Sequence, residues 1–301
     1  APVSRKKLIS RRSLFKQINS TLKQKKTDYK SIDKKLSIFK SELHKLEREN
    51  ADEVYVQSVK WVVQTINLIP VWKYIFELAK PVQVKMVCYF QPAHMSANIA
   101  AADTDIETID VQHGVQGQIH RAYSFWYKVP SEGYAALPKQ FHCWSDFYAE
   151  HINQWFTNCK KHKAKVTGNT YIEYYKKNAL SKAIIYPDKL ILFTTQPVED
   201  PLNDALMYVI SNTCNEYNWW IRFHPRHKDK ELMIKKINRY VANGKINYTD
   251  ATNRPLLEIL SSTSLHLTYF STCFIEAIEF GVKTILLDEI AETAFPDIID
   301  S

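Results

Sequence analysis

Apolar residues recur along the chain in short blocks, separated by longer stretches in which apolar and polar residues mix. Short apolar blocks are typical of buried strands, and the mixed stretches are typical of amphipathic helices. Strands are predicted at residues 85–90, 106–111, 141–144, 190–194, 219–223, 246–248, 265–268 and 284–287. Helices are predicted at 53–80 with an interruption at Pro70, and at 93–102, 146–156, 201–216, 230–242, 255–261 and 272–280. This repeated strand–helix order predicts an α/β fold with parallel sheets.

The alternation forms two series, which meet between residues 160 and 190. A chain of 301 residues with 45% hydrophobic content is long enough for two domains. We expect a Rossmann-like domain at 51–165 and a second at 166–301, with a substrate cleft between them. Residues 1–50 precede both as a separate arm.

The arm carries the excess positive charge. It holds 15 Lys or Arg against five Asp or Glu, whereas the whole chain has a net charge of +8. Apolar residues spaced by three or four positions predict one helical stripe, made of Ile32, Leu36, Phe39, Leu43 and Leu46. The stripe would pack on the protein itself or on a partner chain, or the basic helix would dock on an anionic membrane surface.

Several classes of protein are disfavoured. No apolar run is long enough to span a bilayer, and the charged first residues predict no secretory signal. The five cysteines show no C-x-x-C spacing, which favours reduced thiols and a cytoplasmic location, at most peripheral on the inner face of the membrane. With six glycines the chain has neither a dinucleotide nor a P-loop fingerprint. The ten histidines lack the spacing of a metal site, and the arm carries no nucleic-acid motif, so neither a metal nor a nucleic-acid partner is expected.

Two segments suggest a ligand site. Ile221-Arg-Phe-His-Pro-Arg226 and Phe270-Ser-Thr-Cys-Phe-Ile-Glu-Ala277 each leave a predicted strand and enter a loop or helix. Ligands of open α/β sheets bind beyond the carboxyl ends of the strands, where loop amides favour anions. The hydroxyls of Ser271 and Thr272 would bind phosphate or simply cap the helix that follows, and the sequence leaves both readings open.

A third segment offers a general base. His113 follows a predicted strand between Gln112 and Gly114, where a backbone without side chain permits close approach of a ligand. The alternative is a histidine that only hydrogen-bonds its loop. His120 and Tyr123, further along the same loop, would contact an acceptor or belong to an ordinary exposed loop.

These motifs together resemble the bacterial GT-B glycosyltransferases that build capsule, O-antigen and teichoic acid. The resemblance rests on Gln112-His-Gly114, Trp144-Ser145, Thr167-Gly-Asn169, Arg222-Phe-His-Pro-Arg226 and Ser271-Thr-x-x-x-Glu276, in that order over residues 80 to 290. The group includes CMP-sugar transferases and CDP-glycerol glycerophosphotransferases. The resemblance implies a GT-B fold of two Rossmann-like domains.

The resemblance also implies roles for individual residues. His224 and Pro225 would lie at the nucleotide, with Arg222 or Arg226 supplying positive charge. Ser271 and Thr272 would bind the donor phosphates, and Glu276 would accept ribose hydroxyls. The resemblance places the base at His113. Apart from the resemblance, the positions of Glu199 and Asp200 after a predicted strand make them the reserve carboxylates, and Gln112, Gly114, His120 and Tyr123 would line the acceptor side.

We therefore expect an inverting, metal-independent glycosyltransferase without a cofactor. Its donor would be a nucleotide sugar, with a CMP-sugar favoured, and its acceptor a surface glycan or a lipid-linked glycan. A CDP-glycerol-type polyol-phosphate transferase is the alternative within the same fold. A non-catalytic scaffold that binds a membrane or a partner is the alternative outside it.

Overall fold

The structure, a computed structural model, describes residues 51–124, 126, 129–178, 186–227 and 229–299, together with Ser37, Ile38, Lys40, Ser41 and His44. The five apolar residues of the arm's predicted stripe lie outside this set, so the arm's proposed membrane role stays a prediction. No helix among the described residues is long and apolar enough to cross a membrane.

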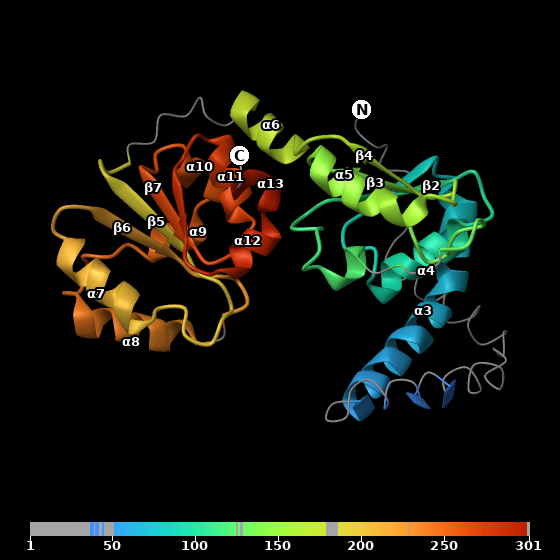
Figure 1. The fold of residues 1–301 in the computed structure, drawn as a ribbon, viewed down its shortest axis with the longest axis horizontal. Coiled ribbons are helices and arrows are strands. Elements are labelled where there is room, and N and C mark those ends of the chain that lie inside the picture. The colour runs from blue at the N-terminus through green and yellow to red at the C-terminus, as the bar shows by residue number, and fades with distance from the viewer. Residues whose placement is uncertain are drawn as a thin grey trace. The chain divides into compact units, whose positions relative to one another are not determined.

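The chain divides into two compact units. Of the described residues, unit 1 comprises those up to His113 and those within Phe125–Val166, and unit 2 comprises those within Gly114–Ser124 and Thr167–Ser301. The segment Gly114–Ser124 therefore packs with the second unit although it lies within the sequence of the first. In the described part of the chain, each unit contains one parallel sheet of four strands with helices around it (Figure 1).

Unit 1 carries its strands in sequence order, β1-β2-β3-β4, all parallel. Its strands are β1 (Gln83–Met86), β2 (Glu107–Val111), β3 (Gln140–Cys143) and β4 (Lys163–Val166). Its helices are α3 (Ala51–Ala79), α4 (Pro92–Ala101), α5 (Asp146–Asn153) and the 3-10 turn η3 (Gln154–Phe156). The core contains the ring cluster of Tyr89, Trp126, Phe141 and Phe156.

Helix α3 differs from the expected interrupted helix because it continues through Pro70. Proline removes one backbone donor from a helix interior, which costs stability but does not prevent continuation. The first predicted strand also differs. It covers residues 83–86 instead of 85–90, and Cys88 takes a left-handed conformation with φ 56° that ends the strand.

Unit 2 has the strand order β6-β5-β7-β8, again all parallel. Its strands are β5 (Leu190–Thr194), β6 (Asn218–Arg222), β7 (Leu265–Thr268) and β8 (Thr284–Leu286). Its helices are α6 (Thr170–Asn178), α7 (Asp204–Thr213), α8 (Lys230–Tyr240), α9 (Thr249–Asn253), α10 (Leu256–Leu260), α11 (Cys273–Glu279), α12 (Ile290–Ala294) and α13 (Pro296–Ile299), with the turn η2 (Arg121–Tyr123) from the inserted segment. The strand expected at 246–248 is only an isolated bridge from Asn247 to Trp220.

The sheet of unit 2 is buried on both faces, which its nearly continuous apolar strands predict. Ile191 and Phe193 of β5 point into a cluster with apolar residues of α7 and α8, which lie side by side in Figure 1. Leu190 and Leu192 point to the opposite face, against α9, α10 and α11. The period-two alternation of side chains thus separates two cores with one strand.

A close packing contact in unit 1 gives a stability prediction. Gly133 has φ 73°, and a Cβ built there would lie 2.4 Å from Nε2 of His162. Gly244 has φ 86° with nothing within 4 Å of a built Cβ, so it shares the backbone strain without the clash. We expect Gly133→Ala to lower the free energy of unfolding by about 1–3 kcal/mol more than Gly244→Ala, because an added methyl must displace a packed ring. Urea unfolding of both variants measures the difference, and equal losses would contradict the contact.

Candidate functional site

The sheet of unit 2 contains a topological switch point. Strand β5 comes first in the chain, and the next two strands, β6 and β7, pair with its two opposite edges. The connections from β5 and β7 therefore leave the sheet in opposite directions, and ligands of open α/β sheets bind outside the carboxyl ends at such a point. Residues 195–203, 223–229 and 269–272 follow the three relevant strands here.

Thr195 fixes the loop that carries the His-Pro pair. Its buried hydroxyl accepts the backbone N–H of His224 at 2.9 Å and donates to the carbonyl oxygen of Arg222 at 3.2 Å. Nε2 of His227 lies 3.1 Å from the same oxygen. One hydroxyl thus orients both histidines of the loop. The motifs found in the sequence do not include Thr195, whose one local signal is that it begins a polar pair directly after a predicted strand.

Gln196, the next residue, fixes the loop after β7. Its Oε1 accepts the backbone N–H of Phe270 at 2.6 Å, and its side chain is buried. The loops after β6 and β7 are therefore both anchored on two consecutive residues at the end of β5. This anchoring holds His224 and Ser271 on the same edge of the sheet.

His224 is held in one tautomer. Its Nδ1 accepts the backbone N–H of Arg226 at 3.1 Å, so the neutral ring carries its proton on Nε2. Burial, followed by the neighbouring His227 and Arg226, lowers the pKa of His224 below its ordinary value. At neutral pH the ring is therefore an uncharged hydrogen-bond donor, and the exposed guanidinium of Arg226 supplies the charge in this loop.

Arg222 has a different environment from Arg226. Its guanidinium donates to the carbonyl oxygens of Ala251 and Arg254, at 2.6 and 2.7 Å. Burial lowers its pKa from the ordinary value, and Glu276 counteracts this shift. Arg222 therefore caps the carboxyl end of α9 by binding carbonyl oxygens there, and its positive charge opposes the rise that burial causes in the pKa of Glu276.

The loop after β7 brings the other expected residues together. Ser271 accepts the backbone N–H of Cys273 at 3.3 Å through its hydroxyl, as a helix cap does. A Cβ built on Gly114 would lie 3.7 Å from Cγ2 of Thr272, an ordinary van der Waals distance. Gly114 and Thr272, from segments far apart in the sequence, thus lie side by side in unit 2. Val115 packs against the apolar cluster of Phe274, Ala291, Ala294 and Phe295, which supports this arrangement.

Glu276 lies in the first turn of α11. Burial raises its pKa to about 7, against the opposing charge of Arg222 and a hydrogen bond with Cys273. A carboxyl group titrating near neutrality can both accept and donate hydrogen bonds. Perturbed carboxyl groups at strand ends are candidates for functional sites, although buried structural pairs also show such shifts.

In unit 1, His113 follows β2 and pairs with a thiol. Its Nε2 lies 2.9 Å from Sγ of Cys88, the residue in left-handed conformation after β1. The imidazole is exposed, which leaves it accessible to an acceptor. Gln112 beside it is buried, and its Oε1 accepts the backbone N–H of Trp144 at 2.7 Å. Gln112 therefore joins the ends of β2 and β3.

The remaining expected residues have defined partners or packing. Asp200 forms an ion pair with Lys236 at 2.9 Å, and with Glu199 it borders a hollow of about 440 Å³ that Arg226 and His227 also line. His120 accepts the backbone N–H of Ala122 through Nδ1 at 3.3 Å, and burial lowers its pKa. Tyr123 is fully buried, so its ring packs inside unit 2.

Comparisons with known proteins identify the fold. Neither protein-family models nor curated protein sequences match the chain. Among solved structures, a UDP-GlcNAc 2-epimerase from Neisseria meningitidis bound to UDP-GlcNAc has a TM-score of 0.52 at 18% identity, over 78% of this chain and 67% of that one. The UDP-GlcNAc 2-epimerase of Methanocaldococcus jannaschii in complex with UDP-GlcNAc and UDP has a TM-score of 0.51 at 15% identity, over 74% and 64% of the two chains. S. aureus MnaA with UDP also scores 0.51, at 18% identity, over 75% and 64%.

These likenesses confirm the α/β class and the GT-B-like pair of Rossmann-type domains. The chain spans 64 to 67% of the length of these proteins. A fold hosts many functions, so the activity must be argued from the site.

Proposed function

We propose that unit 2 binds a nucleotide sugar at the carboxyl ends of β5 and β7, and that the protein transfers the sugar to an acceptor hydroxyl. The observation that carries the proposal is the anchoring of two polar loops on Thr195 and Gln196 at the switch point. The acceptor is a bacterial surface glycan or a lipid-linked glycan, as the resemblance implies. Transfer is inverting and needs no metal.

The chemistry of transfer matches the groups present. A departing nucleotide acquires negative charge on its phosphate, and fixed donors and cations stabilise that charge. His224 offers an Nε2–H, Arg226 a guanidinium, and Ser271 and Thr272 two hydroxyls. The carboxylate of Glu276 accepts hydrogen bonds from the hydroxyls of the ribose.

The nucleotide is a pyrimidine nucleotide. The resembled transferases use CMP- or CDP-activated donors, and the three solved structures named above hold UDP or UDP-GlcNAc. The sequence motifs favour a CMP-sugar as the donor, and the structural likenesses favour a UDP-sugar.

Calorimetric titration with UDP, CDP, CMP and GDP tests the binding half of the proposal. We expect one pyrimidine nucleotide to bind, and His224→Ala to weaken it about 10- to 100-fold, the loss typical of a hydrogen bond to a charged group. His151→Ala in unit 1, where the ring partners Gln154, is the matched control and should bind normally. Unchanged affinity in His224→Ala would contradict the site, and absence of nucleotide binding would favour the non-catalytic scaffold.

Product analysis tests the transfer half. A glycosidic linkage supports sugar transfer, whereas a phosphodiester from CDP-glycerol supports the polyol-phosphate alternative, which the His113-Gly114 motif favours. A nucleotide sugar isomerised without any acceptor would show epimerisation instead. The three products have different masses or different proton spectra, so one reaction mixture distinguishes them.

A further inference from the structure

Unit 1 contains a cavity of about 640 Å³ that plays no part in the proposed transfer. It lies at the amino ends of the strands, since Thr108 is near the start of β2 and Lys139 immediately precedes β3. His113 lies beyond the carboxyl end of β2, at the opposite edge of the same parallel sheet. The polar residues that line the cavity include Asn98, Asp103, Thr108, Lys139, Lys160 and His162. Its volume is in the range of small-molecule sites.

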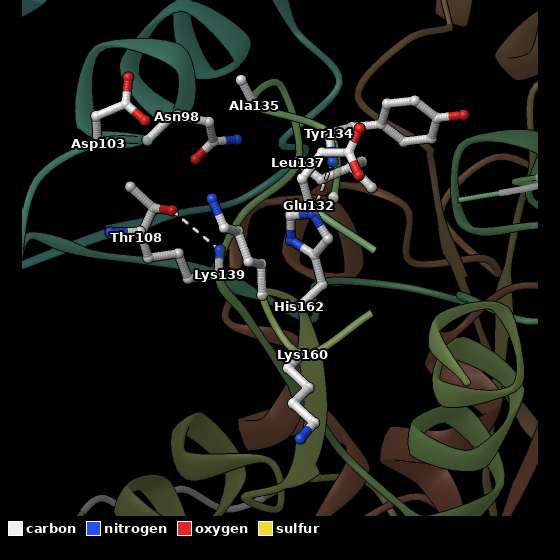
Figure 2. Close-up of a pocket in the computed structure, with 13 residues that line it drawn as sticks. Asn98, Asp103, Thr108, Glu132, Tyr134, Ala135, Leu137, Lys139, Lys160 and His162 are labelled. Carbon is white, nitrogen blue, oxygen red and sulfur yellow. Dashed lines mark hydrogen bonds between the residues drawn. The ribbon is translucent and has the colours of Figure 1, made fainter. Parts of the chain in front are cut away.

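One wall of the cavity is built around His162. The ring donates through Nδ1 to the carbonyl oxygen of Pro138 at 2.8 Å and accepts the backbone N–H of Tyr134 through Nε2 at 3.0 Å. Gly133 packs directly against the same ring. On the other side, the backbone N–H of Lys139 donates to Oγ1 of Thr108 at 3.0 Å (Figure 2). Hydrogen bonds therefore join three parts of unit 1 at the cavity: the segment 133–139, Thr108 of β2, and His162 immediately before β4.

Asn98 supplies an unsatisfied acceptor at this cavity. Its side chain is 2% exposed, and its Nδ2 donates to the carbonyl oxygen of Ala136 at 2.9 Å. Its Oδ1 is buried and has no hydrogen-bond partner among the residues that the structure describes. Buried polar atoms are nearly always paired, so this oxygen can accept a hydrogen bond from a water molecule or from a ligand. A hydroxyl or an N–H group of a ligand would satisfy it.

Positive charge gathers at the same cavity. Lys139, Lys160 and Lys161 outnumber the two carboxylates, Asp103 and Glu132, in its lining. The three lysines also line an adjoining hollow of about 400 Å³, together with Gln140, Lys163 and Lys165. Nζ of Lys139 donates to the carbonyl oxygen of Thr104 at 2.5 Å. Figure 2 shows the side chain of Lys160 pointing away from the other labelled residues. An anionic group at the lysines and hydroxyls at the inner oxygens would match this distribution.

We propose that this cavity is a second binding site, for a monosaccharide that carries a phosphate or a carboxylate. The anionic group binds Lys160 and Lys161, and sugar hydroxyls donate to Oδ1 of Asn98 and to the carboxylates. The site is independent of nucleotide binding in unit 2, because every lining residue belongs to unit 1.

Calorimetry with glucose 6-phosphate and with glucuronate tests the site and separates the two anionic groups. Glucose and inorganic phosphate are the reference ligands, since each has only half of the required chemistry. We expect saturable binding of at least one sugar anion, and binding at least about ten-fold weaker in a Lys160→Ala/Lys161→Ala variant. A Lys60→Ala/Lys73→Ala variant removes two exposed charges from α3 of the same unit and should bind normally.

Four outcomes would overturn the proposal. One is no saturable binding of either sugar anion at millimolar concentration, and another is unchanged affinity in the Lys160/Lys161 variant. The third is that glucose or inorganic phosphate binds as tightly as the sugar anions. Saturation with the nucleotide that binds unit 2 must leave sugar-anion binding intact, because displacement would place the ligand in unit 2. Asn98→Leu should lower the affinity for the sugar anions more than the affinity for phosphate. If Asn98→Leu does not fold, the Lys160→Ala/Lys161→Ala variant decides the test.

Discussion

Replacing His113 with alanine is expected to lower kcat for sugar transfer about 10²- to 10⁴-fold and to leave the Kd of the nucleotide unchanged. A positioned general base contributes a factor of this size when it removes the proton of the attacking hydroxyl. Nucleotide binding is assigned to unit 2, whereas His113 belongs to unit 1, so the two measurements report on separate parts of the chain. Steady-state kinetics and calorimetry on one preparation check both.

Variants of neighbouring and alternative groups make this test specific. Cys88→Ala removes the thiol 2.9 Å from Nε2 of His113 and should cost far less activity than loss of the ring itself. Glu199→Gln and Asp200→Asn test the reserve carboxylates, and Asp200 already partners Lys236. A larger loss in either carboxylate variant than in His113→Ala would move the base to the loop after β5.

Local pattern was sufficient for most of the fold. The strand predicted at 190–194 agrees with β5, because a run of apolar and β-branched residues has one favourable place, inside a sheet covered on both faces. The strand predicted at 85–90 extends too far because Cys88 adopts a left-handed backbone that no residue type in the segment announces. The predicted strand 246–248 makes only the bridge from Asn247, since two further short helices, α9 and α10, follow immediately.

The candidate site could be predicted less completely from the sequence, because contacts between residues far apart in the chain build it. Thr195 meets the backbone of His224 across 29 positions, and Gln196 meets that of Phe270 across 74. The motifs identified His224 and Ser271 as residues but gave no sign of the side chains that orient their loops. The packing of Gly114 beside Thr272 likewise depends on the segment Gly114–Ser124 belonging to unit 2, which has no local signature in the sequence.

Glu276 should make the stability of the protein fall as pH rises from about 5 to 8. Burial raises the pKa of its carboxyl to about 7, from 4.5 in a model compound. Between these two values the native protein holds a proton that the unfolded chain has lost, so raising the pH favours unfolding. The contribution is complete below the unfolded pKa and disappears as pH passes the folded pKa. Its size is about 3 kcal/mol at most, at 1.36 kcal/mol per pKa unit.

Urea unfolding at pH 5 and pH 8 measures this contribution against Glu276→Gln. The wild-type protein should lose about 2–3 kcal/mol more between the two pH values than the variant, because glutamine does not titrate. Glu279→Gln on the same helix, where the carboxylate is exposed and pairs with Lys176, should retain the wild-type slope. Equal slopes in wild type and Glu276→Gln would show that the carboxyl is already ionised at pH 5. Glu276 would then lie in a more polar environment beside Arg222, suited only to accept hydrogen bonds from a ribose.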